Sequence, residues 1–309
     1  MTYKSFLLST ILLMVVIPGQ LIFAYEGNPV QQHFLFTTRQ LFPGDPLIVE
    51  IPDREYAFVS ARITNPRNRT VSSAEGFLRE AQNSWYLFLA LPNTMPPGYY
   101  RFEIAYTHAS GRSTTLQRIF RVHTRDFNEE IIPLNRQQTL VRTSNPQQRA
   151  AESETLGRIL STANPQNWFW TGTFIFPLES IRRTAYYGDR RVFVYDDGTR
   201  ATSIHLGVDY GGPTGTPVFA PGDGMVVFAA FRQVTGWTLV LEHVPGLFTL
   251  YFHLDSLNVT LNQLVRQGQI IGKLGSTGLS TGPHLHWEAR ILLESVDPEF
   301  FITNPILMD

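Results

Sequence analysis

Short runs of alternating apolar and polar residues, separated by glycine and proline, occur along most of this 309-residue chain. Neighbouring side chains of a β-strand point to opposite faces, so this period of two favours strands over helices. In the N-terminal part, the runs cover residues 33–37, 47–51, 56–63, 85–90, 99–106 and 115–122. Several short strands at this spacing predict an all-β sandwich over residues 25–126.

The end of this predicted sandwich contains Pro97-Gly98-Tyr99-Tyr100, followed by an alternating strand. It resembles the last hairpin of an immunoglobulin-like domain. His33, His108 and His123 are scattered through this part of the chain, and we predict no catalytic constellation in it.

A different pattern follows over residues 127–168, which we interpret as a linker. Residues 129–133 are predicted to form a solvated charged turn, and residues 135–148 are polar without a period. Residues 150–162 favour a single helix, which Asn164-Pro165 ends. From residue 169 to 309 strand-like runs return, at 224–231, 237–243, 248–254, 270–274 and 284–291, and they predict an antiparallel sheet domain.

Composition excludes several functional classes. The chain has no cysteine, so disulfides, thiolate metal sites and cysteine nucleophiles are excluded, and a metal site must use His, Asp and Glu. The formal net charge of −1 gives no basic patch for nucleic acid, and no nucleic-acid partner is predicted.

The first residues have the pattern of a targeting segment. Lys4 precedes a nearly unbroken apolar run over residues 6–17, Pro18-Gly19 ends it, and Ala24 offers a small residue for cleavage. We interpret residues 1–24 as a signal peptide, although Ile22 is not the small residue expected two positions before Ala24. The alternative is an uncleaved membrane anchor, for which the run is shorter than the roughly 20 residues of a span. Both readings predict an exported protein in the periplasm or cell envelope, or secreted.

Five of the eight histidines lie between His205 and His286. In a strand, residues two apart share a face, so His284 and His286 are expected to emerge side by side. Two neutral imidazoles and a carboxylate are a common ligand set for catalytic zinc, with water as the fourth ligand. His205 and Asp209 complete such a set if the fold brings them beside that strand.

Residues 174–298 resemble the lysostaphin-like, or LytM, domain of peptidase family M23. The matching residues follow the family's order: Phe176-Pro177, Tyr187-Gly188, Arg190, His205-x₃-Asp209, Gly215-Thr-Pro-Val218, Asp223-Gly224, Tyr251-x-His253, Gly268-Gln269, Ile271-Gly272 and Ser280-Thr-Gly-Pro-His-Leu-His286. The resemblance implies a C-terminal antiparallel β-sheet domain of the duplicated hybrid motif type. The predicted fold class is therefore mainly β, with an immunoglobulin-like sandwich, a helical linker and this peptidase domain.

The resemblance also implies residue roles. His205, Asp209 and His286 would bind one Zn2+ per chain, and His253 and His284 would act as catalytic histidines, with the general base left open between them. His243 is expected to be structural, and Glu288 to support or pack against the site without binding metal. The chain departs from the family at Val234-Thr-Gly-Trp237 and in a longer charged segment over residues 190–203, which could line or partly cover the groove.

Three functions remain open at this stage. The first is a zinc-dependent endopeptidase that cuts the peptides of bacterial peptidoglycan. The second is a non-catalytic LytM-type regulator of other wall hydrolases, and the third is a zinc peptidase that acts on a protein. The partner of the N-terminal domain is unknown from the sequence, as is the bond cleaved.

Overall fold

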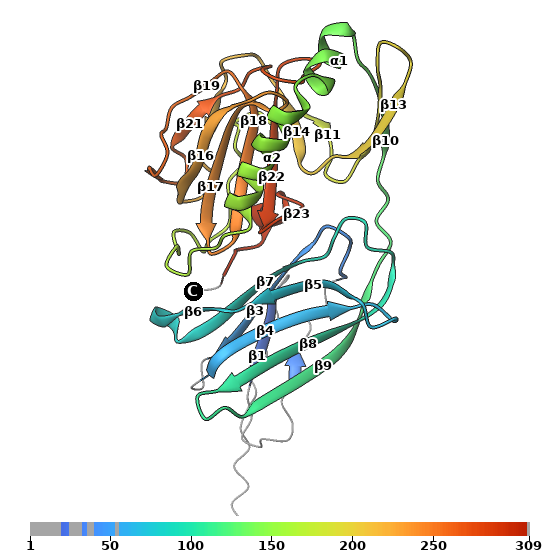
Figure 1. Cartoon of the computed structure of the whole chain (residues 1–309). Coiled ribbons are helices and arrows are strands. Elements are labelled where there is room, and N and C mark those ends of the chain that lie inside the picture. The colour runs from blue at the N-terminus through green and yellow to red at the C-terminus, as the bar shows by residue number, and fades with distance from the viewer. Residues whose placement is uncertain (1–19, 25–32, 36–39, 53–55, 308–309) are drawn as a thin grey trace, which may run out of the picture.

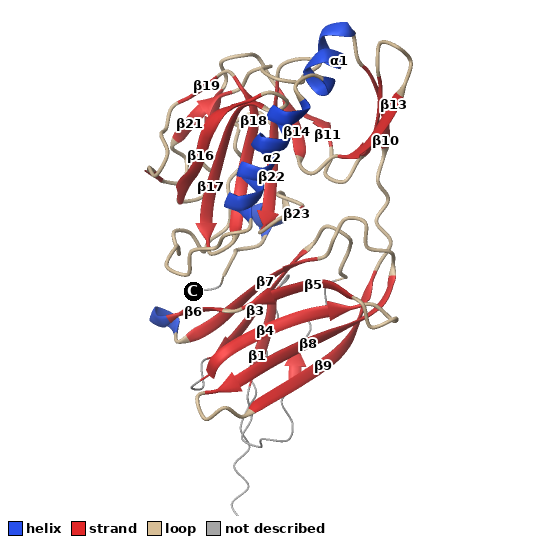
Figure 2. Cartoon of the chain, in the orientation of Figure 1, coloured by secondary structure: helices blue, strands red, loops and turns tan. Residues whose placement is uncertain are grey.

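The computed structural model describes residues 20–24, 33–35, 40–52 and 56–307. Two groups of β-sheets lie at opposite ends of the molecule, and a segment with two helices follows the first group (Figure 1). Strands dominate both ends (Figure 2), which confirms the mainly β fold class. The immunoglobulin-like type of the N-terminal part stays a prediction.

The N-terminal part has two sheets, whose strands follow the orders β2-β1-β3-β7-β6 and β5-β4-β8-β9. In the first sheet the strands are β1 (Gln20–Ala24), β2 (His33–Leu35), β3 (Pro46–Pro52), β6 (Phe77–Arg79) and β7 (Ser84–Ala90). In the second they are β4 (Tyr56–Thr64), β5 (Thr70–Glu75), β8 (Gly98–His108) and β9 (Ser113–Val122). A 3-10 helix, η1 (Glu80–Gln82), joins β6 to β7.

The predicted signal peptide falls mostly outside the described residues, which begin at residue 20. Its last part forms strand β1, which pairs in parallel with β3.

Successive side chains of β3 and β7 point to opposite faces of the first sheet, and both faces are buried. Val49 and Leu87 pack with Phe102 of the second sheet in the core between the two sheets. Ile48 and Phe88 point the other way and join the core of the C-terminal part. The first sheet is therefore a middle layer, with apolar contacts on both sides.

The C-terminal part is built around an eight-stranded sheet of order β11-β14-β22-β18-β17-β16-β20, with β23 paired to β22. Its strands are β11 (Arg183–Ala185), β14 (Val208–Gly211), β16 (Gly224–Arg232), β17 (Gly236–Val244), β18 (Leu247–Leu254), β20 (Leu264–Val265), β22 (His284–Ile291) and β23 (Glu294–Val296). A three-stranded sheet contains β15 (Pro217–Phe219), β19 (Ser256–Leu257) and β21 (Ile270–Lys273). Another contains β10 (Glu129–Pro133), β12 (Arg190–Val194) and β13 (Arg200–Ile204).

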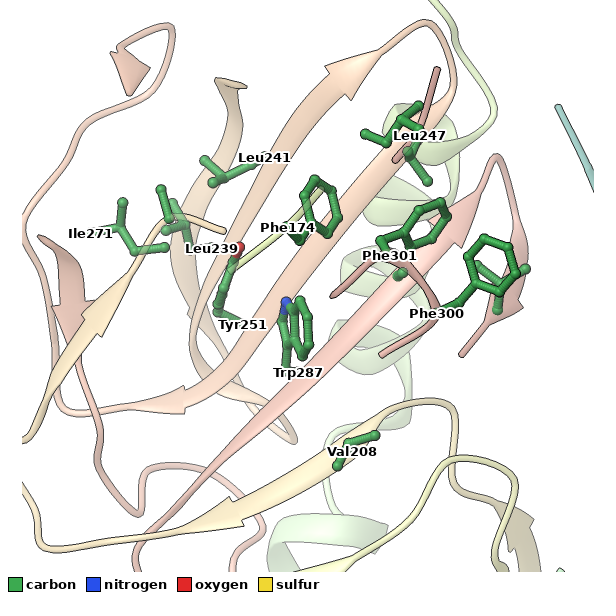
Figure 3. Close-up of a cluster of buried hydrophobic side chains, with 14 of the residues drawn as sticks. Phe174, Val208, Leu239, Leu241, Leu247, Tyr251, Ile271, Trp287, Phe300 and Phe301 are labelled. Carbon is green, nitrogen blue, oxygen red and sulfur yellow. The ribbon is translucent and has the colours of Figure 1, made fainter. Parts of the chain in front are cut away.

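One face of the large sheet forms the main apolar core. Figure 3 shows Trp287 and Tyr251 at its centre, with Leu239 and Ile271 nearby. Trp287, Tyr251, Leu239 and Ile271 are all fully buried. Burial of an aliphatic or Phe side chain contributes about 1.5–3 kcal/mol to folding stability, so this face is a main source of the stability of the domain.

The described residues contain three α-helices: α1 (Arg136–Thr143), α2 (Pro146–Leu160) and α3 (Phe300–Thr303). Residues 127–168 thus hold two helices, where the sequence analysis expects one. The missed helix, α1, buries no residue, and its only apolar residues are the adjacent Leu140 and Val141, which give a weak local signal. It begins with a capping box between Asn135 and Gln138, and contacts with distant loops hold it in place.

The expected solvated turn over residues 129–133 is wrong. This segment is strand β10, which pairs in parallel with β12. The pairing joins segments about sixty positions apart, as Glu130 and Arg191 show, and a local pattern carries no signal for such a pairing.

Direct contacts join the two parts of the molecule. The Asp297 amide donates to the Gly44 carbonyl (2.9 Å), and the Arg190 guanidinium donates to the Asn93 carbonyl (2.9 Å). Tyr86 of β7 packs against Trp168, with ring centroids 5.5 Å apart. None of the helices in the described residues is both long and apolar enough to cross a membrane.

Candidate metal centre and groove

Two neighbouring strands place a carboxylate and two imidazoles on the face opposite the apolar core. Strand β14 pairs antiparallel with β22, so that Asp209 lies opposite His286 and Gly211 opposite His284. Leu285 and Trp287, which alternate with the histidines, point into the core. The expectation that His284 and His286 share a face therefore holds in the structure, because β22 is a regular strand.

Three ligand-type atoms converge at this point. Asp209 Oδ1 lies 2.8 Å from His286 Nδ1 and 3.1 Å from His205 Nε2, and the two ring nitrogens are 2.9 Å apart. All three side chains are buried. Two imidazole nitrogens and a carboxylate oxygen around one point fit a divalent metal of the zinc type, with room for further ligands from solvent or substrate. His205, Asp209 and His286 form a metal-binding site.

Backbone and side-chain partners fix which nitrogen faces the metal site. His205 follows β13, and its Nδ1 lies 2.8 Å from the Tyr186 carbonyl, to which an Nδ1–H donates, so Nε2 is left for the metal. His286 uses the opposite arrangement, because its Nε2 lies 2.8 Å from Glu288 Oε1. Arg290 in turn donates to Glu288 Oε2 (2.7 Å). Such outer partners set the tautomer and orientation of a metal-binding histidine.

The charges of the site are coupled. Burial works to raise the pKa of Asp209, but the charges and hydrogen bonds of His205 and His286 hold it well below its usual range. Burial also works to lower the pKa of His286, but bonds to Asp209 and Glu288 outweigh it and raise the pKa to about 9. A metal would require an unprotonated nitrogen on His286, so its binding would compete with the proton that this raised pKa favours.

Two further histidines stand beside the three ligand residues. His284 Nε2 lies 3.8 Å from Asp209 Oδ1, and its Nδ1 lies 2.8 Å from the Gly282 carbonyl. His253 lies at the end of β18, with its ring centroid 4.8 Å from that of His284. Its Nδ1 is 2.8 Å from the Thr277 carbonyl, so an Nδ1–H donates there and Nε2 remains available.

The backbone of His253 is unusual, with a φ of +62°. A side chain other than glycine pays a cost in this left-handed region, and such residues are concentrated at functional sites. Burial, then the neighbouring charge of His284, lowers the pKa of His253 to about 3. His253 is therefore neutral at pH 7, with a lone pair on Nε2.

A groove of about 470 Å³ surrounds these side chains. Its lining includes all five predicted site residues: His205, Asp209, His253, His284 and His286. Part of the lining comes from the linker and the hairpin after it: Glu130 and Ile132 of β10, Arg142 of α1, and Arg191 and Phe193 of β12. Figure 1 shows α1 and the β10–β13 sheet to one side of β14 and β11. The expectation that residues 190–203 could line the groove agrees with this arrangement.

The remaining histidine of the C-terminal part, His243, lies away from the groove. Its ring packs 4.7 Å from the Phe174 ring in the apolar core, and its nitrogens lie 2.7 Å from the Asp223 carbonyl and 2.8 Å from Thr249 Oγ1. Glu288, by contrast, touches the metal ligand His286 directly. Sequence reasoning missed Arg191, whose guanidinium contacts Asp209, because the contact spans two strands from different sheets.

The domain that carries this site matches a known family. The family model for peptidase family M23 matches residues 203–298, which include the three metal ligands and both neighbouring histidines. The chain carries a peptidase M23 domain.

Similar proteins agree with that assignment. A segment of 95 residues is 45% identical to the DD-carboxypeptidase/endopeptidase Mpg of Neisseria meningitidis and covers 31% of this chain and 22% of that protein. A segment of 112 residues is 39% identical to the peptidoglycan DD-endopeptidase ShyC of Vibrio cholerae and covers 36% of this chain and 25% of that one. The chain thus spans about a quarter or less of the length of these relatives.

A Pseudomonas aeruginosa crystal structure assigned to peptidase M23 resembles most of the chain. It has a TM-score of 0.56 and 23% identity, and the alignment covers 84% of this chain and 94% of that one. The alignment covers more of the chain than residues 203–298, so the likeness of fold extends beyond the segment that matches the family model.

Proposed function

We propose that this protein is a zinc-dependent endopeptidase that hydrolyses peptide cross-links of bacterial peptidoglycan. The observation that carries the proposal is the convergence of His205, Asp209 and His286 in an open groove with two further histidines. The relatives named above are a DD-carboxypeptidase/endopeptidase and a peptidoglycan DD-endopeptidase, which favours the cross-link between D-alanine and a diamino acid over a glycine bridge.

The ligand set supports one Zn2+ per chain. Bound there, zinc would supply Lewis acidity, which polarises the scissile carbonyl and lowers the pKa of the attacking water. Glu288 holds His286 in the orientation that this requires, because it accepts from the ring nitrogen on the far side.

His253 and His284 are the proposed catalytic histidines. Each has Nδ1 against a backbone carbonyl, so each presents Nε2 toward the groove. The neutral His253 ring can accept a proton from the attacking water, and an imidazole on the other side can donate to the developing oxyanion. The assignment of these two roles between His253 and His284 stays open.

The alternative role, a non-catalytic regulator, would be favoured by a domain that has lost its metal ligands. All three ligands are present here and lie together, which supports the enzyme. Action on peptidoglycan also implies a place in the cell envelope, in agreement with the predicted signal peptide and with the cell-wall relatives.

The test is digestion of defined cross-linked muropeptides by the zinc-loaded protein, with the products weighed by mass spectrometry. We expect dimers joined by D-alanine and a diamino acid to yield two monomers, and glycine-bridged dimers to stay intact. Asp209→Ala is the control and should behave like the metal-free protein. If the zinc-loaded protein cuts neither dimer, the proposal fails, and if it cuts only an unrelated protein such as casein, the substrate is wrong.

A further inference from the structure

Arg191 lies outside the segment that matches the M23 family model, yet its side chain contacts the metal site. It belongs to β12, which lies between β10 and β13 in the small three-stranded sheet. The register places Arg191 beside Glu130 of β10 on one side and Ser203 of β13 on the other. All three residues line the groove.

The guanidinium of Arg191 makes two ionic contacts in different directions. Its Nη2 donates to Asp209 Oδ2 (2.6 Å), and its Nε donates to Glu130 Oε2 (3.0 Å). The rigid, planar fork of an arginine suits such a bridge, whereas a lysine offers a single charged nitrogen.

The two oxygens of Asp209 therefore have different partners. Oδ1 faces the ring nitrogens of His205 and His286, whereas Oδ2 is held by Arg191. Rotation of the carboxylate would break the short contact to Arg191, so the arginine selects Oδ1 as the metal-facing oxygen. The contact is shielded from water, because the side chains of Arg191 and Asp209 are 16% and 7% exposed.

A positive charge near a cation also opposes metal binding, so the two effects must be weighed. One oxygen of Asp209 lies between the guanidinium and the metal-facing atoms, and Glu130 offsets the charge of Arg191. Loss of an outer partner of a metal ligand typically weakens binding about 10- to 100-fold. Orientation of the ligand is therefore expected to outweigh repulsion.

We propose that Arg191 is a positioning residue that fixes Asp209 as a ligand through one oxygen, and that Glu130 of the linker strand holds Arg191 in place. The inference rests on the proposed metal-dependent function. It makes β10, a strand that precedes the M23 domain in the chain, part of the metal site. The linker then contributes to metal affinity as well as to the groove wall.

The test measures zinc affinity of the full chain by competition with a chromophoric chelator, with no substrate present. We expect Arg191→Ala to bind zinc about 10- to 100-fold more weakly, Arg191→Lys to lie between this variant and the unmodified protein, and Glu130→Gln to show a smaller loss than Arg191→Ala. The matched control is Arg142→Ala, because Arg142 lines the same groove but contacts Tyr195 and Phe193 instead of Asp209. Its zinc affinity should not change.

Calorimetry of the metal-free proteins separates ligand positioning from a general loss of structure. The proposal is overturned if metal-free Arg191→Ala unfolds cooperatively and binds zinc as tightly as the unmodified protein. It is also overturned if Arg142→Ala loses as much affinity. If Arg191→Ala does not fold, Arg191→Lys decides in its place, and unchanged affinity there overturns the proposal. Unchanged affinity in Glu130→Gln overturns the role of Glu130.

This readout is independent of peptide hydrolysis. A protein that binds zinc with the expected dependence on Arg191 but releases no peptide would refute the proposed function and leave the role of Arg191 standing.

Discussion

Strands β7 and β22 each bury both faces, but they use the second face in different ways. In β7, Leu87 faces the core between the N-terminal sheets, and Phe88 on the other face packs into the C-terminal part. In β22, Trp287 faces the apolar core, and His286 and Glu288 on the other face form a buried polar network. The same period of two thus produces a docking surface in one strand and a metal site in the other.

Burial alone does not define a structural face. Buried polar groups are tolerated where each has a partner, as Asp209, His286 and Glu288 have. The apolar second face of β7 contributes stability, whereas the polar second face of β22 is expected to contribute chemistry.

The largest expected effect is a loss of catalysis and comes from a change in the groove beside the polar face of β22. We expect His253→Ala to lower kcat for muropeptide cleavage about 10²- to 10⁴-fold, because a general acid–base group is lost. Zinc affinity should stay near that of the unmodified protein, since His253 is not one of the three ligands. Steady-state kinetics and chelator competition measure the two quantities. Full activity in His253→Ala would contradict a catalytic role for His253.

A change at the apolar face of β7 should lower stability and leave the metal site intact. Phe88→Ala is expected to lower the free energy of unfolding by about 3–5 kcal/mol, because it removes a side chain that is 3% exposed and packed in the core. Zinc affinity of the folded protein should not change. Urea unfolding measures the loss, and Ile119→Ala, at a position that is 69% exposed, is the control with an expected change below about 0.5 kcal/mol. Equal losses in both variants would contradict the docking role of Phe88.

The smallest expected effect is a dependence of stability on pH, and it comes from a histidine in the apolar core of the C-terminal part. Burial lowers the pKa of His243 from 6.5 to about 4. Between these values the unfolded chain binds more protons than the folded chain, so stability rises with pH. The contribution of His243 is complete above pH 6.5 and is lost as the pH falls toward 4, by at most about 3 kcal/mol.

Urea unfolding at pH 7, 5.5 and 4.5 measures this dependence, with a chelator present so that zinc binding makes no contribution. His243→Gln is the control, because glutamine does not titrate, and its stability should fall less over this range. Parallel curves for the two proteins would show that His243 is not the source of the dependence.

Much of the site could be predicted from the sequence because it depends on local rules. The period of two placed His284 and His286 on one face, and the absence of cysteine restricted the ligands to His, Asp and Glu. Resemblance to a family then identified His205 and Asp209 as partners. The strands at 224–231 and 284–291 were also found within a residue or so of β16 and β22.

The tertiary structure alone decided the features that join distant segments. The parallel pairing of β10 with β12, the contact of Arg191 with Asp209 and the place of α1 beside the groove have no local signature. Hydrophobic period and turn residues report on neighbours a few positions apart, whereas these contacts form only after the chain has closed loops of many residues. The sequence by itself determined the strands and the candidate ligands, and the tertiary structure determined which side chains hold those ligands in place.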